Sequence, residues 1–391
     1  MSHISRLAAL SDDDARRKSA SQRAATHGDQ TRNDMGQKSQ LSIVDLREDP
    51  DDDWPDALED AAFHGLAGEF IDVVLPETEA DAAALLFHLL GYSAAMIGRE
   101  RYFPVSGTNH HARLFSVAVG GTSSGRKGTA LDAVSHVFAA VDLGGEFAAE
   151  NVVSGLTSGA GLVWHVRDRQ DGEDFDEVDD KRLLVIESEF GGVLKVCQRK
   201  ENDLSAVIRD AWDGKSLRSL AKREPARATH PHINLIGHVT REELRATLSK
   251  VDVSNGFAAK RSKLLPDGGE LHLRNLSNLT AGILRAVAFG QTPGRMVRTD
   301  KARNLWHDVY GKLTAPRPGI FGQVTTRAEA QVLRLSMLYA ILDESNEIDE
   351  PHIEAALAVW AYSEASARWA FGGSLGNRTA DEILLALREV A

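Results

Sequence analysis

The chain has 391 residues, of which 42% are hydrophobic and 26% charged, and its net charge at pH 7 is −12. This length predicts about two to three domains of a soluble globular protein. The only cysteine, Cys197, excludes an internal disulfide framework and a multi-cysteine zinc site, and it favours a cytoplasmic location. The acidic balance excludes a surface that is basic throughout, but it is compatible with a local basic patch that binds DNA. No apolar run approaches the roughly 18 residues that a membrane span needs.

The first part of the chain, residues 1–56, is polar and ends in an acidic run, so we expect a disordered leader. Residues 57–112 contain apolar stretches that predict helices, and the longest of these ends near Leu90. We expect these helices to form the N-terminal part of a core that spans residues 57–300.

A glycine-rich turn lies between a predicted buried strand at residues 114–119 and an amphipathic helix that begins near Leu131. Strand, glycine-rich turn and helix together are the context of a phosphate-binding loop, in which backbone N–H groups, the helix N-terminus and a lysine hold phosphates. The candidate nucleotide-binding residues are Gly120, Gly121, Thr122, Ser123, Ser124, Gly125, Arg126, Lys127, Gly128 and Thr129.

The spacing in this turn is imperfect, because the usual motif is glycine, four residues, glycine, lysine and then serine or threonine. Counted from Gly121, Lys127 takes the lysine position and Arg126 stands where glycine is usual. Counted from Gly120, Gly125 is the second glycine and Arg126 is inserted before the lysine. Lys127 is the phosphate lysine in both counts. The alternative is a flexible turn that only caps the helix.

A second predicted strand, residues 183–186, ends in the carboxylates Glu187 and Glu189. A phosphate-loop ATPase needs one carboxylate near Mg²⁺ and another that orients the attacking water. We assign Glu187 to the metal and Glu189 to the water, although the two roles can be exchanged. The candidate Mg²⁺ hydroxyl is Ser124 or Thr129. The alternative is a strand that simply ends in a polar loop.

A third predicted strand, residues 232–239, also ends in polar groups, and Asn234, His238 or Thr240 is a candidate sensor of the γ-phosphate. The segment before this strand is basic, which is unusual in an acidic chain. Its candidate DNA-binding residues are Lys215, Arg218, Lys222, Arg223 and Arg227.

The order of these landmarks resembles the helicase-type ATPase module of phage, plasmid and mobile-element replication proteins, which is often joined to primase-polymerase domains. It is more distantly similar to the minichromosome maintenance branch of AAA+ helicases. The resemblance covers roughly residues 57–375 and is more specific than any single motif. The stretches that carry it are GTSSGRKGT at 121–129, IESEF at 186–190, AWDG at 211–214, IGHVT at 236–240, NGFA at 255–258 and RSKLLP at 261–266.

The resemblance implies an α/β phosphate-loop NTPase of AAA+-like type, with a three-layer core and a C-terminal helical lid at residues 301–372. It implies that Arg334, and less surely Arg327, point back at the nucleotide from this lid. Residues 373–391 would be a linker and the start of a truncated winged-helix-like domain. The implied ligands are ATP and Mg²⁺. The implied partners are single-stranded DNA in a pore, further copies of the chain in a ring that is expected to be hexameric, and a primase or another replication protein.

The sequence therefore predicts an ATP-dependent DNA helicase or replication-initiation motor. The alternative is a nucleotide-binding regulatory or scaffold subunit with impaired hydrolysis. The atypical phosphate loop favours this alternative, and so does the direct passage from Ala258 to Arg261, where relatives have a short strand that carries an arginine.

Overall fold

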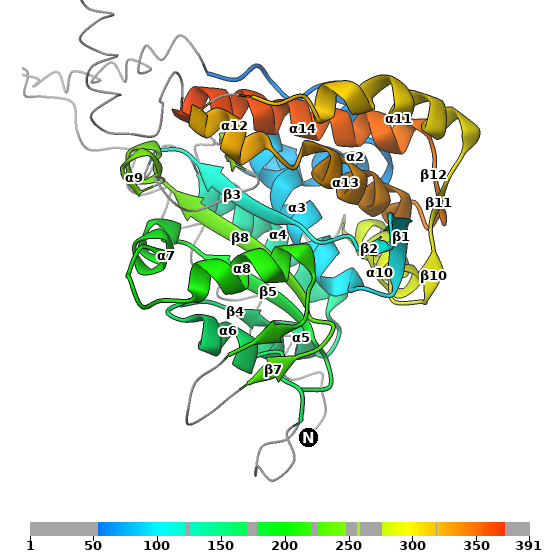
Figure 1. Cartoon of the computed structure of the whole chain (residues 1–391). Helices are drawn as coiled ribbons and strands as arrows, with labels where there is room; N and C mark the ends of the chain where they lie inside the picture. Colours follow the sequence, from blue (N-terminus) through cyan, green and yellow to red (C-terminus); the bar gives the residue numbers. More distant parts are fainter. Residues whose placement is uncertain are drawn as a thin grey trace, which may run out of the picture. The chain divides into compact units, whose positions relative to one another are not determined.

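A five-stranded parallel sheet with the strand order β4-β5-β8-β3-β9 lies between two layers of helices (Figure 1). The computed structural model describes residues 54–121, 126–169, 178–219, 226–247, 256–258, 276–317 and 319–371. All of these belong to one compact unit, Asp52–Ala391. The strands are β3 (Phe115–Val119), β4 (Val152–Val153), β5 (Arg182–Glu187), β8 (His232–Val239) and β9 (Gly256–Ala258).

Alternate residues of the central strands face opposite layers, as the two-residue period of a strand requires. In β3, Val117 and Val119 join the hydrophobic cluster on one face, whereas Ala118 joins the cluster on the other. In β8, Leu235 and Ile236 divide in the same way. Because both faces are covered, the strands read as continuous apolar runs in the sequence, which is typical of a parallel sheet. The predicted α/β class is confirmed.

The first face of the sheet carries α3 (Ala82–Ile97), α4 (Lys127–Val141) and α10 (Ser277–Gly290). The Asp81 side chain caps α3 by accepting from the backbone N–H of Ala84 at 3.0 Å. The helix passes Leu90, where the sequence suggested its end, and stops at Gly98, whose φ of +81° suits glycine. Gly91 lets α3 approach the sheet, because a Cβ there would lie 2.9 Å from Cδ1 of Ile236.

The second face carries α6 (Gly159–Trp164), α7 (Phe190–Cys197), α8 (Leu204–Asp213) and α9 (Arg241–Thr247). Shorter elements are η2 (Asp60–Phe63), α2 (Gly65–Val74), η3 (Leu75–Glu77) and α5 (Glu146–Glu150). Among the residues that the structure describes, three small sheets lie outside the main one. Their strands are β1 (Arg101–Val105), β2 (Thr108–His110) and β10 (Gly294–Arg295); β11 (Val297–Arg298) and β12 (Glu347–Ile348); and β6 (Leu217–Arg218) and β7 (Arg227–Ala228).

The segment expected to form a lid contains α11 (Asp300–Leu313), α12 (Gly319–Thr325), α13 (Ala328–Leu342) and α14 (Glu350–Phe371). These helices do not stand apart from the core. Buried residues of α13 and α14 belong to the same hydrophobic cluster as those of α2 and α3, and both helices contact the N-terminal helical region. Helix α13 and the first part of α14 therefore pack in the cluster on the first face, whereas Ile320 of α12 and the end of α14 join the cluster on the second face.

The linker and winged-helix start predicted at 373–391 lie outside the described residues, and so does the leader predicted at 1–56 except for residues 54–56. Among the helices that the structure describes, none has both the length and the apolar character needed to cross a bilayer.

Candidate functional site

The landmarks predicted separately along the sequence meet at the carboxyl edge of the sheet. Strand β8 lies between β5 and β3, with Glu187 opposite Gly237 and Val119 opposite Val239. Just beyond β3, the N–H of Gly120 donates to the carbonyl oxygen of Val239 at 3.2 Å. The start of the phosphate loop, the acidic end of β5 and the polar end of β8 are therefore neighbours. Ligands of open α/β sheets bind at this edge, outside the carboxyl ends of the strands.

Lys127 is the first residue of α4, and its side chain lies against the loop that precedes the helix. Its Nζ donates to the carbonyl oxygens of Gly120 and Gly121 at 2.8 and 3.0 Å. The residue is only 9% exposed, and burial lowers its pKa, while the nearby charges of Glu243 and Glu242 oppose that shift. A buried ammonium at a helix N-terminus, bonded to neutral carbonyls, is well placed to receive an anion.

Arg126 adopts a left-handed backbone conformation, with φ +42° and ψ +28°. Such a conformation is easy only for glycine, and Arg126 stands where the motif counted from Gly121 has its second glycine. The backbone therefore favours the count from Gly121 over the count from Gly120. The Arg126 side chain holds the turn through an ion pair of 2.6 Å with Glu79, whose side chain is 6% exposed.

In this count, Gly128 occupies the position of the usual Mg²⁺ hydroxyl. Thr129 is the next residue and the third of helix α4. Thr129 is half-buried. Its hydroxyl lies one position further along the helix than the motif requires. The other hydroxyl candidate, Ser124, lies outside the described residues together with Thr122, Ser123 and Gly125.

The two carboxylates after β5 have different environments. Glu187 is 8% exposed, and its Oε1 accepts from the backbone N–H of Leu156 at 2.7 Å, in the small-residue stretch that follows β4. Glu189 is exposed and occupies the cap position of α7. An anchored carboxylate suits a metal-binding role, and an exposed carboxylate suits contact with water, so this contrast favours the roles assigned from the sequence over their exchange.

Two of the three sensor candidates on β8 face the first layer of helices rather than the carboxyl edge. The Asn234 side chain accepts from the N–H of Leu114 at 2.8 Å. His238 Nε2 lies 2.8 Å from His88 Nε2 on α3, and because His88 donates from Nδ1 to a carbonyl, its Nε2 is the acceptor. Burial lowers the pKa of His238 to about 3 and that of His88 to about 4, so both rings are neutral.

Thr240, the third candidate, lies at the edge itself and forms a capping box with Glu243. The Glu243 N–H donates to Thr240 Oγ1 at 3.2 Å, and Glu243 Oε2 accepts from the Thr240 N–H and hydroxyl at 3.3 and 3.1 Å. A Cβ at Gly191 would lie 3.1 Å from the Glu243 carboxyl carbon, so Glu243 also packs on the start of α7. The Thr-x-x-Glu spacing predicts the capping box, but not the proximity of Glu243 to Lys127.

The structure does not bring Arg334 to the phosphate loop of its own chain. Arg334 is buried in α13, with its guanidinium 3.9 Å from the ring centre of Trp212. The carbonyl of Asp213, next to this ring, accepts from Arg113, which precedes β3, whereas the loop follows β3. At about 3.3 Å per residue along a strand, the two ends of this segment are roughly 20 Å apart. Within one chain, Arg334 therefore lies near the opposite end of β3 from the phosphate loop.

The basic segment before β8 forms a hairpin of β6 and β7 at the amino edge of the sheet. Arg218 pairs with Arg227 across the hairpin, and both side chains are exposed, whereas Leu217 and Ala228 are buried. Lys215, at the base, is 60% exposed and lies 2.7 Å from Asp213. Two further candidates, Lys222 and Arg223, lie outside the described residues.

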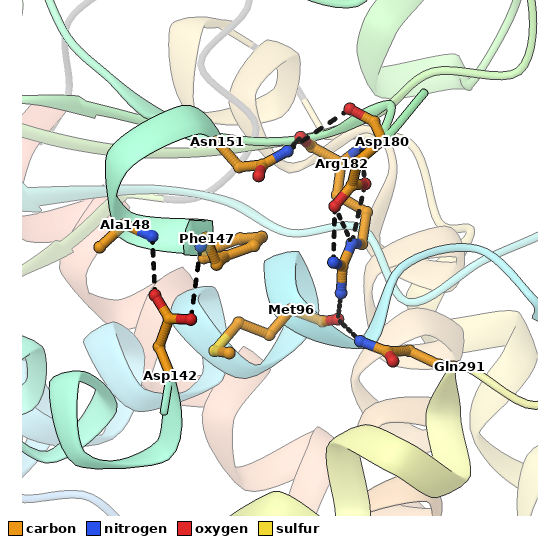
Figure 2. Close-up of polar contacts among 8 residues, drawn as sticks. All are labelled: Met96, Asp142, Phe147, Ala148, Asn151, Asp180, Arg182 and Gln291. Atoms are coloured by element: carbon orange, nitrogen blue, oxygen red, sulfur yellow. Dashed lines mark hydrogen bonds and ion pairs between the residues drawn. The ribbon is translucent and has the colours of Figure 1, made fainter. Parts of the chain in front are cut away.

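A cleft of about 400 Å³ lies near the ends of α3, α4 and α10. Figure 2 shows polar contacts in this region. Its central guanidinium, Arg182, donates to the Met96 carbonyl at 2.5 Å and to Asp180 at 2.9 Å, and it lies over the Phe147 ring. Gln291 donates to the same carbonyl at 2.9 Å. These polar groups already hydrogen-bond to one another and to the Met96 carbonyl at the end of α3, so we assign no ligand to this cleft.

Among the described residues, His64, Asp343 and His352 have the residue types and the proximity of a metal site. However, His352 Nδ1 accepts from the N–H of Asp349 at 2.9 Å, so its Nε2 carries the hydrogen and donates to Asp343 at 3.1 Å. A protonated nitrogen has no lone pair for a metal. We interpret the group as a structural link in which Asp343 accepts from both histidines.

Comparison with protein-family models and with curated protein sequences found no match for this chain.

Proposed function

We propose that the chain is an ATP-binding phosphate-loop NTPase of AAA+-like type, working in an oligomer as a DNA helicase or replication-initiation motor. The observation that carries this proposal is the meeting of Gly120, Lys127, Glu187 and Thr240 at one edge of a parallel sheet. These residues come from three strands and a helix, and each has the chemistry that its place in such a site requires.

The phosphates of ATP would replace the carbonyl partners of Lys127, because an ammonium and the N-terminus of α4 both favour negative charge. Glu187 would hold Mg²⁺, and the ion would supply positive charge that neutralises the phosphates. The Leu156 N–H fixes one oxygen of this carboxylate and so orients it. Glu189 would orient the attacking water, and Thr240 would contact the γ-phosphate.

The strand order supports the AAA+-like assignment. One strand, β8, separates the strand that enters the phosphate loop from the strand that ends in carboxylates. The polar end of β8 then lies between the phosphates and the water-orienting acid, as the AAA+ resemblance implies for a sensor strand.

The basic hairpin supports a role on DNA. Arg218 and Arg227 are exposed on β6 and β7, and Lys215 is exposed at their base, in a chain of net charge −12. Lys215 pairs with Asp210 and Asp213, and Arg227 lies 3.9 Å from Asp168, so Arg218 is the cation that these ion pairs leave available. A local row of cations on an acidic protein can hold a phosphate backbone without making the whole surface basic.

The second candidate function is a nucleotide-binding regulatory or scaffold subunit that does not hydrolyse ATP. Gly128, which has no hydroxyl, stands at the usual Mg²⁺ position in the count that the Arg126 backbone favours. ATP turnover of the full chain, measured with and without single-stranded DNA, separates the two. We expect DNA-stimulated turnover that Glu189→Gln abolishes while ATP still binds. Binding without turnover under all conditions supports the scaffold role, and failure to bind ATP refutes both.

A further inference from the structure

Three arginines from distant parts of the sequence meet at the amino edge of the sheet, and we call them the arginine cluster. They are Arg113 before β3, Arg327 before α13 and Arg334 within α13. The guanidinium carbons of Arg327 and Arg334 lie 4.3 and 3.9 Å from the ring centre of Trp212. Arg113 donates to the backbone carbonyl of Asp213 at 3.2 Å.

The arginine cluster carries more positive than negative charge. The carboxylate that meets it, Asp213, is shared between Arg327 at 3.0 Å and Lys215 at 2.7 Å. Of the ion pairs between described residues, none includes Arg113 or Arg334. Neither guanidinium therefore has a carboxylate at ion-pair distance, and Asp213 attracts both only from further away.

These two guanidiniums are also buried and incompletely hydrogen-bonded. Arg113 is 1% exposed and Arg334 is 3% exposed. In the described part of the chain, Nε and Nη1 of both residues, together with Nε1 of Trp212, have no acceptor. Burial, and then repulsion from Arg334 and Arg99, lowers the pKa of Arg113 against the attraction of Asp213. Burial lowers the pKa of Arg334 to about 9, although Asp213 opposes this shift. A buried cation in this condition destabilises a protein unless an anion accompanies it.

We infer that the arginine cluster is a binding site for a phosphate group. Guanidinium N–H groups match phosphate oxygens in a planar, two-pronged arrangement, and the missing acceptors are those that such an oxyanion supplies. Gly214, with φ +74°, lies against the Arg113 guanidinium at a place where a side chain would collide with it.

The position of the cluster indicates how a phosphate reaches it. Arg327 and Asp213 have side chains that are 38% and 27% exposed, so this side of the cluster opens to solvent. The basic hairpin begins directly after it, at Lys215. The phosphate can belong to a nucleic-acid strand held along the hairpin, or it can be a free phosphate. The site does not depend on nucleotide binding at Lys127.

Thermal unfolding of the full chain in inorganic phosphate, against chloride at matched ionic strength, tests the site. At a phosphate concentration about 100-fold above Kd, linkage predicts a rise of about 4 °C in the Tm of a unit of this size. Arg334→Met should lose this rise, and in chloride it should be at least as stable as the wild type, because an unpaired buried charge is removed. Arg327→Met, at a more exposed position, should weaken the rise.

Two controls make the result specific. Arg285→Met removes an exposed arginine, paired with Glu344, from a distant helix, and it should keep the full rise. Lys127→Ala removes the anion site at the phosphate loop, so the rise that remains in this background, and that Arg334→Met then removes, belongs to the arginine cluster.

A short oligothymidylate then identifies the source of the phosphate. If the strand supplies it, inorganic phosphate competes with the oligonucleotide, and Arg334→Met lowers the salt slope of binding by about 0.7. If the site takes free phosphate, the rise in Tm occurs and oligonucleotide affinity is unchanged by the variant. An equal rise in the wild type and in Arg334→Met, or no rise in either, overturns the inference.

Discussion

The left-handed backbone at Arg126 gives a prediction of stability that comes directly from the structure. Replacement by glycine and by alanine removes the same ion pair with Glu79. Alanine keeps the left-handed conformation, which costs a residue with a Cβ about 1–2 kcal/mol. Glycine avoids this cost but loses about 0.4–1 kcal/mol through the greater freedom of the unfolded chain. We therefore expect Arg126→Gly to be more stable than Arg126→Ala by roughly 0.5–1 kcal/mol.

The comparison with the wild type adds the ion pair. The Arg126 side chain is 38% exposed, so its pair with Glu79 contributes at most about 1 kcal/mol after screening by solvent. We expect Arg126→Ala to be less stable than the wild type by about this amount and Arg126→Gly to lie between them. Urea unfolding of the full chain, followed by circular dichroism, measures all three free energies, and the m-value should stay constant.

A matched position shows that the order is specific. At Arg285, inside α10, the same two substitutions should give the reverse order, because glycine is about 1 kcal/mol less favourable than alanine within a helix. If Arg126→Ala is as stable as Arg126→Gly or more so, the left-handed conformation is refuted, and with it the count of the phosphate loop from Gly121.

Three further predictions concern the buried histidines, the acids and the hairpin. The folded pKa values of His88 and His238, about 4 and 3, lie below the unfolded value of 6.5, so the unfolded chain binds more protons. The free energy of unfolding should therefore fall as the pH decreases from about 6.5 toward 4, by up to about 1.4 kcal/mol per pH unit for each ring, and His238→Gln should flatten this dependence. Glu189→Gln should bind ATP normally but stop its hydrolysis, because the attacking water loses its orienting base, and a turnover assay with a separate binding titration checks this. Replacing Lys222 and Arg223 by alanine should weaken single-stranded DNA binding, flatten its salt slope by about 0.7 for each lost contact and leave ATP affinity unchanged.

Each of these results has a contrary outcome. An unfolding free energy that is flat below about pH 6.5 would mean that the two rings are not held neutral. Glu201→Gln changes another exposed glutamate and serves as the control, which should turn over ATP normally. If Glu189→Gln also turns over ATP normally, the end of β5 is purely structural. If the salt slope of DNA binding is unchanged in the Lys222 and Arg223 double variant, the hairpin does not contact DNA, and the scaffold role is favoured.

The sheet and its carboxyl edge were predictable because the signals are local. The strands that end at Val119, Glu187 and Val239 are apolar runs followed at once by glycine or polar residues. Parallel pairing then brings their ends together, and no tertiary detail is needed to infer a site there.

The direction of individual side chains was less predictable. Asn234 and His238 face α3 because they share the two-residue period of Ile236, and only the packing of the layers decides which face that is. Arg334 is carried away from the phosphate loop by the packing of α13 on the core, which no spacing in the sequence reveals.

Charge patterns were misleading in a similar way. Runs of like charge are usually solvated loops, and Asp168 lies at the start of an acidic stretch. In the structure its carboxylate pairs with Lys181 and accepts from the N–H and hydroxyl of Thr229, and these bonds lower its pKa despite partial burial. The environment of such a carboxylate is set by partners that are distant in the sequence, and the local composition does not reveal these partners.

Nucleotide binding at the carboxyl edge of the sheet is tested most directly by calorimetric titration of the full chain with ATP and Mg²⁺, in which the wild type is compared with Lys127→Met. A charge-assisted hydrogen bond to a phosphate contributes about 1.5–3 kcal/mol, so we expect Lys127→Met to lose ATP affinity by roughly 10- to 150-fold or more. Lys195→Met, which removes an exposed lysine from α7, should bind like the wild type. Equal ATP affinity in the wild type and in Lys127→Met would contradict the claim that this edge of the sheet is a nucleotide site.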